Sequence, residues 1–186
     1  VFTQVVSTSE EFKLVNQGPS VSQLQEEALL KIIENMNMED FLFVSGSHPE
    51  GITYTTYEKI AKAAQLRRFK LILDTSADFV PDLLKYRPYL IKPNDEELAE
   101  WFGLINPSLE EIKDCGQKLL EKGAENVLVS LGEKGAILFT PTETIHVTAP
   151  KGEVVNTACA GDTLLATFVG SQLLGLSNEE ALIKAV

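Results

Sequence analysis

The stretch that decides the fold runs from Asn156 to Gly170 and reads NTACAGDTLLATFVG. A run of small side chains, residues 158–161, precedes the charged Asp162, and a long apolar segment follows. The N–H groups and dipole of a helix N-terminus attract anions, and small side chains let a ligand approach the backbone. The stretch therefore predicts an apolar helix that opens at an anion-binding turn. Asp162 is then either a simple helix-capping acid or a carboxylate that acts on the bound ligand.

Strands and helices alternate along the chain before this stretch. Short, continuously apolar runs such as FLFV (41–44) and KLILD (70–74) are typical of buried parallel strands. Helical segments lie between them, for example at about 55–68. Three runs close together, NVLVSLG, GAILFT and TIHVTA, predict strands at 127–148 that form an antiparallel edge. The pattern indicates an α/β fold with a mostly parallel sheet and helices on both faces.

The first part of the chain gives two further expectations. FKLVN (12–16) alternates apolar and polar residues, which predicts a strand. Ser22 and Gln25 have the spacing of a capping box, which predicts that a helix begins there. Apolar residues recur at helical spacing in that helix, so we expect one buried face that consists of Leu24, Ala28, Ile32 and Met36.

Composition limits the function classes. The 186 residues are 44% hydrophobic, and no linker or repeat divides them, so we expect residues 1–186 to form a single α/β unit. The net charge of −11 argues against nucleic acid or an anionic membrane as a partner. Cys115 and Cys159 lack metal-ligand spacing, which favours free thiols in a reducing compartment and a cytoplasmic location. The first residue is not methionine and the sequence stops inside a helical pattern, so we expect a piece of a longer protein.

Ligands of open α/β sheets bind at the carboxyl ends of the strands. Loops follow the predicted strands at such positions, and they read SGSHPEG (45–51), KPNDEE (92–97), SLGEKG (130–135) and NTACAGD (156–162). We expect them to line one edge of the sheet. Neither a P-loop nor the G-x-G-x-x-G fingerprint of dinucleotide-binding proteins occurs, so the two common nucleotide motifs do not apply.

The same loops resemble the pfkB branch of the ribokinase-like sugar kinases. NTACAGD is similar to the family's A-G-D signature, KPNDEEL to its K-P-N-x-x-E segment, and SLGEKGAILF to its S-L-G-x-x-G strand pair. SGSHPEG and NQGP resemble loops of the subgroup that contains 1-phosphofructokinases and tagatose-6-phosphate kinases. The resemblance implies a ribokinase-like α/β/α sandwich and an ATP- and Mg²⁺-dependent kinase that phosphorylates a ketohexose monophosphate, fructose 1-phosphate or tagatose 6-phosphate.

The resemblance also implies roles for individual residues. Asp162 would be the catalytic base beside an anion hole, and Asn94 and Glu97 would organise Mg²⁺ through water. The remaining assignments are the anion hole (Cys159, Ala160, Gly161), the nucleotide side (Lys92, Ser130, Gly132, Gly135) and the substrate side (Ser45, Ser47). Plainer interpretations stay open: Asn94 and Glu97 as a helix cap, the two glycines as hairpin residues, the serines as loop formers, and Lys92 as a solvated surface lysine.

Two substitutions and two absences depart from the family pattern. The family usually has glycine where Cys159 stands, and alanine or glycine where Thr167 stands. The front portion, with the first strands of the main sheet and a β-sheet lid, and a segment after residue 186 are expected outside this sequence. A homodimer would form through that lid. The alternatives are a non-catalytic nucleotide- or phosphate-binding module, or a kinase of the same family with another acceptor, such as a nucleoside or a vitamin.

Overall fold

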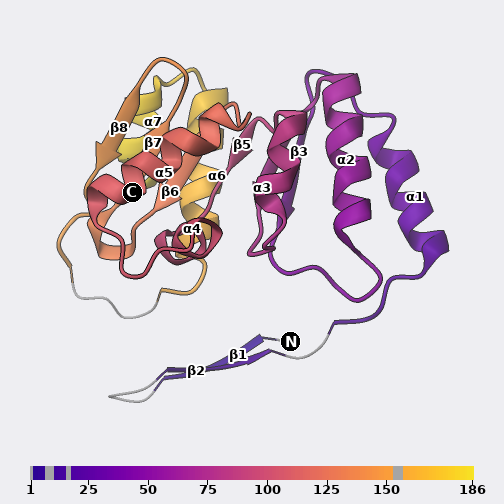
Figure 1. The fold of residues 1–186 in the computed structure, drawn as a ribbon, viewed down its shortest axis with the longest axis horizontal. Helices are drawn as coiled ribbons and strands as arrows, with labels where there is room; N and C mark the ends of the chain where they lie inside the picture. Colours follow the sequence, from indigo (N-terminus) through magenta and orange to yellow (C-terminus); the bar gives the residue numbers. More distant parts are fainter. Residues whose placement is uncertain (1, 7–10, 16–17, 153–156) are drawn as a thin grey trace.

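The computed structural model describes residues 2–6, 11–15, 18–152 and 157–186, and Figure 1 shows their arrangement. The main body is a six-stranded sheet in the order β3-β4-β5-β6-β7-β8. Its strands are β3 (Phe41–Ser45), β4 (Lys70–Asp74), β5 (Leu90–Ile91), β6 (Val127–Ser130), β7 (Ala136–Phe139) and β8 (Thr144–Val147). The first four strands are parallel to one another, β7 is antiparallel to β6, and β8 is antiparallel to β7, which confirms the predicted α/β fold and its antiparallel edge.

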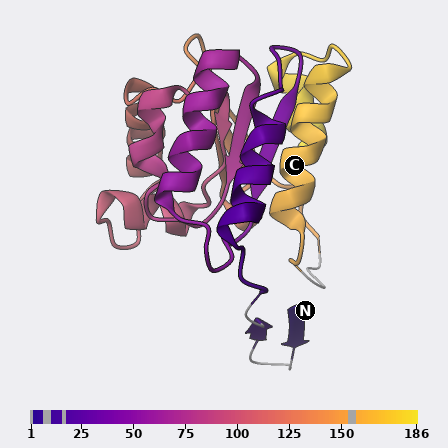
Figure 2. The same ribbon diagram turned by 90° about the vertical axis from the view of Figure 1, so that its right-hand side faces the viewer.

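Helices cover both faces of this sheet, as Figure 2 shows edge-on. The helices are α1 (Gln23–Ile33), α2 (Tyr54–Arg67), α3 (Val80–Leu83), α4 (Asp95–Phe102), α5 (Leu109–Glu121), α6 (Ala160–Leu173) and α7 (Asn178–Ala185), with short 3₁₀ turns η1 (Leu84–Tyr86) and η2 (Gly132–Lys134). Helices α1 to α5 contribute to the core on one face, and α6 and α7 pack on the other.

The core has two parts, one on each face of the sheet, because successive side chains of a strand point to opposite faces. On β4, Leu71 and Leu73 point into the core beneath α1–α5, whereas Ile72 points towards α6. The same alternation places Leu128 and Leu138 against Phe168 of α6. Because successive side chains of a strand face opposite sides, a continuously apolar strand is what a sheet covered on both faces requires.

Helix starts follow the sequence closely. Capping boxes open α1 at Ser22, α4 at Asn94, α5 at Ser108 and α7 at Ser177, each with a Gln or Glu three residues on. In each box the cap side chain and the third helical side chain accept hydrogen bonds from each other's backbone N–H groups. The predicted start at Ser22 is therefore confirmed.

The predicted buried face of α1 is wrong for three of its four residues, whereas Met36, which lies beyond the end of the helix, packs against the core. Leu24 and Ile32 are 79% and 69% exposed, and Ala28 is exposed as well. The helix turns the opposite stripe inward, where Ile33 is buried and Leu30 packs against the same core. Both stripes of α1 are apolar at helical spacing, so periodicity alone could not decide between them.

Two strands, β1 (Phe2–Val6) and β2 (Glu11–Val15), form a separate two-stranded antiparallel sheet. Figure 1 shows it clear of the layered body. The predicted strand at 12–16 is confirmed as β2, whereas β1 was not predicted; Asn16 and Gln17 of the NQGP segment lie outside the described residues. Across the part of the chain that the structure describes, every helix is too short or too polar to cross a membrane.

Candidate functional site

The carboxyl ends of the parallel strands lie along one edge of the sheet. Ser45 and Asp74, the last residues of β3 and β4, are paired in register. The backbone N–H of Lys92, just after β5, donates to the Leu73 carbonyl, and Asn94 forms a bridge with Ser130 at the end of β6. These contacts bring the predicted loops together at one edge.

The first turn of α6 reaches this edge. Ala160 is the first helical residue and Cys159 caps the helix with φ 61°, in the left-handed region that favours glycine. Asp162 lies exposed in the first turn. The helix therefore begins where the sequence predicted, and the cysteine adopts the strained conformation that a glycine would adopt without cost.

A cavity of about 250 Å³ brings most of the predicted site together. It is lined by Gly46, Ser47, Asp74, Ser76, Lys92, Glu97, Thr157, Cys159, Ala160, Gly161 and Asp162. Thus the predicted base, anion hole, lysine, glutamate and one of the two substrate-side serines share one space. Ser45 is outside this lining, although it is exposed on the same edge. We call this space the catalytic cavity, after the predicted role of Asp162.

Lys92 does not have the surroundings of a surface lysine. Its side chain is 7% exposed, and its ammonium forms an ion pair of 3.0 Å with Oδ1 of Asp74, which is 14% exposed. The interpretation as a solvated lysine is therefore wrong. A buried cation is stable only when it is paired, and the partner here comes from the end of the neighbouring strand.

Asp74 is the site residue that sequence reasoning missed. The signal was present, since β4 is an apolar strand that ends in an acid. Burial raises the pKa of the Asp74 carboxyl, the Lys92 ammonium lowers it, and the negative charge of Asp162 raises it further. The two carboxylates therefore interact electrostatically within the catalytic cavity.

Gly161 allows the lysine to lie against the helix. A Cβ built at Gly161 would lie 3.1 Å from Nζ of Lys92. The ammonium thus lies close to the backbone of the first turn of α6, where helix N–H groups and the dipole favour a negative charge. The arrangement presents positive charge from two sources to one small volume.

A second cavity, of about 440 Å³, adjoins the first. The two share Thr157, Ala160 and Gly161 in their linings. The second is also lined by Asn94, Asp95, Glu96, Ser130, Gly132, Gly135, Ala149, Leu164, Ala185 and Val186. The predicted nucleotide-side residues other than Lys92 therefore lie together beside the catalytic cavity.

The glycines of this second cavity also have a structural task. Gly135 has φ 90°, and a Cβ there would overlap the Val147 carbonyl of β8, so only glycine fits between η2 and β7. Gly132 has φ 55° but open space around it. The hairpin interpretation of both residues is consistent with their geometry, and it does not conflict with a place beside a ligand.

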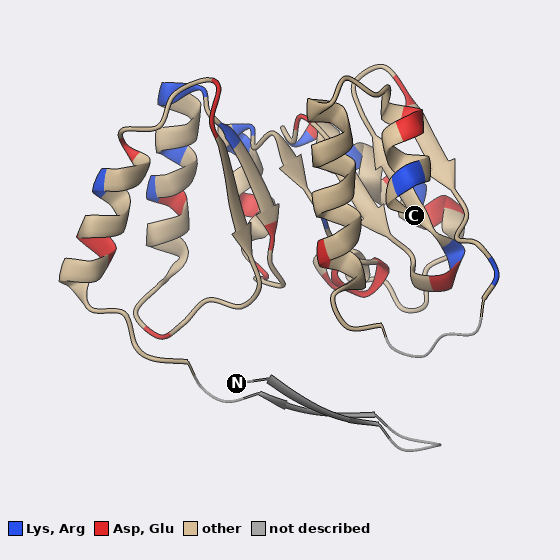
Figure 3. Ribbon diagram, turned by 180° about the vertical axis from the view of Figure 1, so that it is seen from behind, with Lys and Arg blue, Asp and Glu red and all other residues tan. Residues whose placement is uncertain are grey.

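Asn94 and Glu97 form the capping box of α4. Oδ1 of Asn94 accepts from the Glu97 backbone N–H at 2.7 Å, and Oε2 of Glu97 accepts from the Asn94 N–H at 2.9 Å. Asp95, Glu96 and Glu97 make the first turn acidic, and Figure 3 shows red segments where α4 begins. The cap therefore fixes the orientation of Glu97, which also lines the catalytic cavity.

Asn94 and Glu97 fit a magnesium ion only if waters and substrate phosphates supply the remaining ligands. Within residues 2–6, 11–15, 18–152 and 157–186, no group of three His, Cys, Asp or Glu side chains could hold a metal by itself. Mg²⁺ commonly takes one or two carboxylates together with waters and substrate phosphates. Glu97, with one oxygen committed to the cap, suits that mode and does not suit an all-protein cage.

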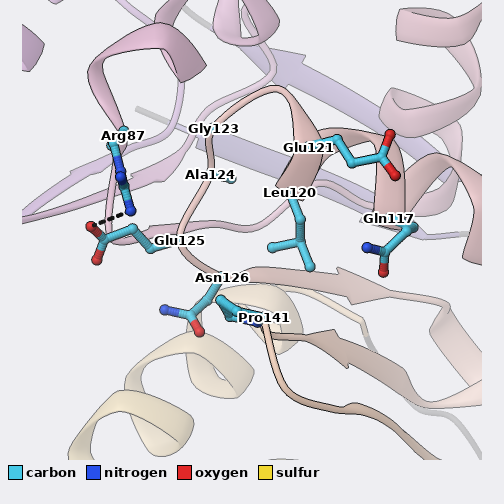
Figure 4. Close-up of a pocket in the computed structure, with 9 residues that line it drawn as sticks. All are labelled: Arg87, Gln117, Leu120, Glu121, Gly123, Ala124, Glu125, Asn126 and Pro141. Carbon is cyan, nitrogen blue, oxygen red and sulfur yellow. Dashed lines mark ion pairs between the residues drawn. The ribbon is translucent and has the colours of Figure 1, made fainter.

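A larger cavity lies elsewhere. It measures about 710 Å³ and opens at the amino ends of β5 and β6, opposite the predicted loops. Figure 4 shows its lining, which includes an ion pair between Arg87 and Glu125. Those side chains are 69% and 44% exposed. No predicted site residue contributes to this cavity.

The chain is similar to known proteins along nearly all of its length. The family model described as pfkB family carbohydrate kinase matches residues 1–186. A D-tagatose-1-phosphate kinase of Bacillus licheniformis is 47% identical, and a 1-phosphofructokinase of Bacillus subtilis is 36% identical, each over 95% of this chain. The chain spans 59% and 58% of those two relatives, respectively.

Solved structures agree on the fold. A structure from Staphylococcus aureus is 36% identical and superposes with a TM-score of 0.85 over 97% of this chain and 59% of its own. Phosphofructokinase-2 from Escherichia coli, in complex with fructose-6-phosphate, gives a TM-score of 0.86 at 23% identity over 97% of this chain and 60% of its own, which supports the fold alone.

Proposed function

The chain belongs to the pfkB family of carbohydrate kinases, and we propose that it carries the nucleotide-binding and catalytic part of an ATP-dependent kinase for ketohexose monophosphates. One observation carries the proposal. The exposed carboxylate of Asp162, the first turn of α6 and the buried ammonium of Lys92 meet in one cavity of about 250 Å³. Phosphoryl transfer requires a residue that orients the nucleophile and preorganised positive charge for the transferred group.

Each residue has a role in this proposal. Asp162 orients the sugar hydroxyl and accepts its proton as the oxygen attacks the γ-phosphorus in line, while the bond to the β,γ-bridging oxygen breaks and ADP leaves. The cap and start of α6, Cys159 to Gly161, bind the transferred group with their backbone, and the Lys92 ammonium neutralises part of its charge. Asp162 needs only to reach the hydroxyl within hydrogen-bond distance, and its exposure leaves that approach open.

The adjoining cavity of about 440 Å³ suits the nucleotide. Ser130, Gly132 and Gly135 border it, and it joins the catalytic cavity at Ala160 and Gly161. A nucleotide bound there would direct its terminal phosphate towards the first turn of α6. Glu97 and Asn94 would hold Mg²⁺ through water, and the ion would supply further charge stabilisation when bound.

The acceptor is proposed from the relatives. Their names, D-tagatose-1-phosphate kinase and 1-phosphofructokinase, point to ketohexose 1-phosphates. Fructose 1-phosphate agrees with the loop resemblance, tagatose 1-phosphate comes from the relative that is 47% identical, and tagatose 6-phosphate remains to be tested beside them. Ser47 and Ser76 line the catalytic cavity and are candidates for contact with the sugar.

A second candidate function is a phosphate- or nucleotide-binding module without catalysis. The left-handed Cys159 at the anion-binding turn favours it, because a Cβ there strains the backbone. Such a module would bind ATP without releasing ADP.

The test is ADP release by a full-length protein that contains this sequence. Mg-ATP is offered with fructose 1-phosphate, tagatose 1-phosphate, tagatose 6-phosphate and fructose 6-phosphate in turn, with a nucleoside as a further acceptor. Release that depends on a ketohexose monophosphate supports the proposal and identifies the acceptor. Binding of ATP with no release from any acceptor would overturn the kinase and favour the binding module.

A further inference from the structure

The partner of Lys92 has a fixed position. Asp74 ends β4 in register with Ser45, and its backbone carbonyl accepts from the Gly46 N–H at 2.8 Å. The strand end and this loop contact hold its backbone in place, and Oδ1 lies 3.0 Å from Nζ of Lys92. Asp74 therefore presents a carboxylate from a rigid element to the base of the catalytic cavity.

Lys92 is confined on a second side by the helix. Its Nζ lies close to Gly161, where even a Cβ would come within 3.1 Å. An exposed lysine is mobile because its four-carbon side chain is flexible. Here the side chain is held between the end of β4 and the first turn of α6. The side chain is 7% exposed, so little solvent competes for the ammonium.

We propose that Asp74 is a positioning residue that holds the Lys92 ammonium against the first turn of α6, where the transferred phosphoryl group binds. This inference rests on the proposed kinase function and adds a residue to it. An ammonium has three N–H donors, and Asp74 accepts one of them. The other two are left for the phosphoryl group and the surrounding loops.

The charges around the pair explain why this acid is needed. Lys92 shares the lining of the catalytic cavity with three acids, Asp74, Glu97 and Asp162. Without Asp74, the ammonium would be free to pair with Asp162 and would neutralise the carboxylate that has to accept a proton. Asp74 therefore keeps Lys92 on the phosphoryl side and leaves Asp162 to the sugar hydroxyl.

The test is a double-mutant cycle in the full-length protein. Asp74→Asn, Lys92→Met and the double variant are compared in kcat for the acceptor that the wild type uses. Asp74→Asn is expected to lower kcat by ~10- to 100-fold, as a displaced catalytic group does. Lys92→Met is expected to lower it by ~100-fold or more. The double variant should be no slower than Lys92→Met, because Asp74 acts through Lys92.

Asp78→Asn is the matched control, since Asp78 is an exposed acid in the same connection between β4 and α3, outside the catalytic cavity. Its kcat should be unchanged. A normal kcat for Asp74→Asn, or a double variant whose loss is the product of the two single losses, would overturn the positioning role. If Asp74→Asn does not fold, the double variant decides. A double variant that folds and has the same kcat as Lys92→Met supports the positioning role.

Calorimetric titration with ATP separates the two proposals. If the wild type releases no ADP, the proposed kinase function is wrong. The coupling between Asp74 and Lys92 can still be measured through ATP binding. Asp74→Asn and Lys92→Met should then each weaken ATP binding by ~10-fold, the effect of one lost hydrogen bond to a charged group, and the double variant should lose no more. ATP affinity that is unchanged in Asp74→Asn would overturn the positioning role by itself.

Discussion

The two ends of the parallel strands carry the same kind of ion pair in opposite surroundings. At the carboxyl edge, Lys92 and Asp74 pair at 3.0 Å with side chains 7% and 14% exposed. At the amino edge, Arg87 and Glu125 pair at 3.8 Å with side chains 69% and 44% exposed. The cavity beside the buried pair is about 250 Å³, and the cavity beside the exposed pair is about 710 Å³.

If the proposed function is right, cavity size is a poor guide to the site in this molecule. An exposed ion pair is weakened by water and contributes little to stability or to binding. A buried cation beside a helix N-terminus attracts an anion strongly, because little water screens it. Burial and converging charge therefore identify the smaller cavity as the candidate site.

The largest expected contrast is in catalysis. Asp162→Asn should lower kcat by ~10²- to 10⁴-fold, because the amide cannot accept the proton of the sugar hydroxyl. Glu121→Gln, an equivalent change in the lining of the larger cavity, should leave kcat unchanged. Circular dichroism should show that both variants fold. Near-normal turnover in Asp162→Asn would remove the catalytic role of this residue.

The next contrast is in stability. Lys92→Met leaves Asp74 buried without its partner and should cost about 3 kcal/mol in the free energy of unfolding. The cost falls at the low end of the range because Asp74, whose pKa is raised by burial, can take up a proton. Arg87→Met should cost less than ~1 kcal/mol. Denaturant titrations measure both, and equal costs would contradict the comparison.

A smaller effect is expected at the start of α6. Cys159→Gly should stabilise the protein by ~1 kcal/mol, because glycine adopts φ 61° without the strain of a Cβ. Glycine also raises the entropy of the unfolded chain, which limits the gain. Thermal unfolding measures the change. A lower melting temperature for the glycine variant would show that the left-handed turn does not strain Cys159.

The smallest effect concerns a partly buried network around Glu58. Glu58 accepts hydrogen bonds from Tyr86 at 2.7 Å and Tyr54 at 3.2 Å and pairs with Lys62. These contacts lower the pKa of Glu58 to about 2, and the hydrogen bond from Tyr86 makes the largest contribution. A lowered folded pKa gives stability that is present above the unfolded pKa of ~4.3 and is lost as the pH falls towards 2.

Glu58→Gln should therefore lower stability at pH 7 and flatten its decline between about pH 4.5 and 2, since the variant has no carboxylate to protonate there. Urea titrations at a series of pH values measure this slope. The same slope in the wild type and the variant would show that the network does not lower the pKa of Glu58.

The sequence predicted the fold well because the strands are continuously apolar and the helices carry explicit start signals. KLILD became β4, and the capping box at Ser22 opens a helix as expected. It failed at α1, where Leu24 and Ile32 form a second apolar stripe. Amphipathic periodicity shows which stripes could be buried, and only tertiary packing selects one of them.

Only part of the candidate site was predicted from the sequence, because only part of it depends on neighbouring residues. The small-residue run before Asp162 signals an anion-binding turn, and the structure places that turn in the catalytic cavity. The burial of Lys92 could not be predicted, because it depends on Asp74, an acid 18 residues earlier on the neighbouring strand. Pairs between adjacent parallel strands leave no spacing pattern in a single sequence.

The most direct test of the central claim is to find which edge binds ATP. Hydrogen–deuterium exchange of a full-length protein is measured with and without Mg-ATP. The account predicts slower exchange in the first turn of α6, residues 160–163, and in the β6–β7 connection, residues 130–135, with no change at residues 123–126 of the larger cavity. Protection at 123–126 without protection of α6 would place the nucleotide at the amino edge and contradict the account.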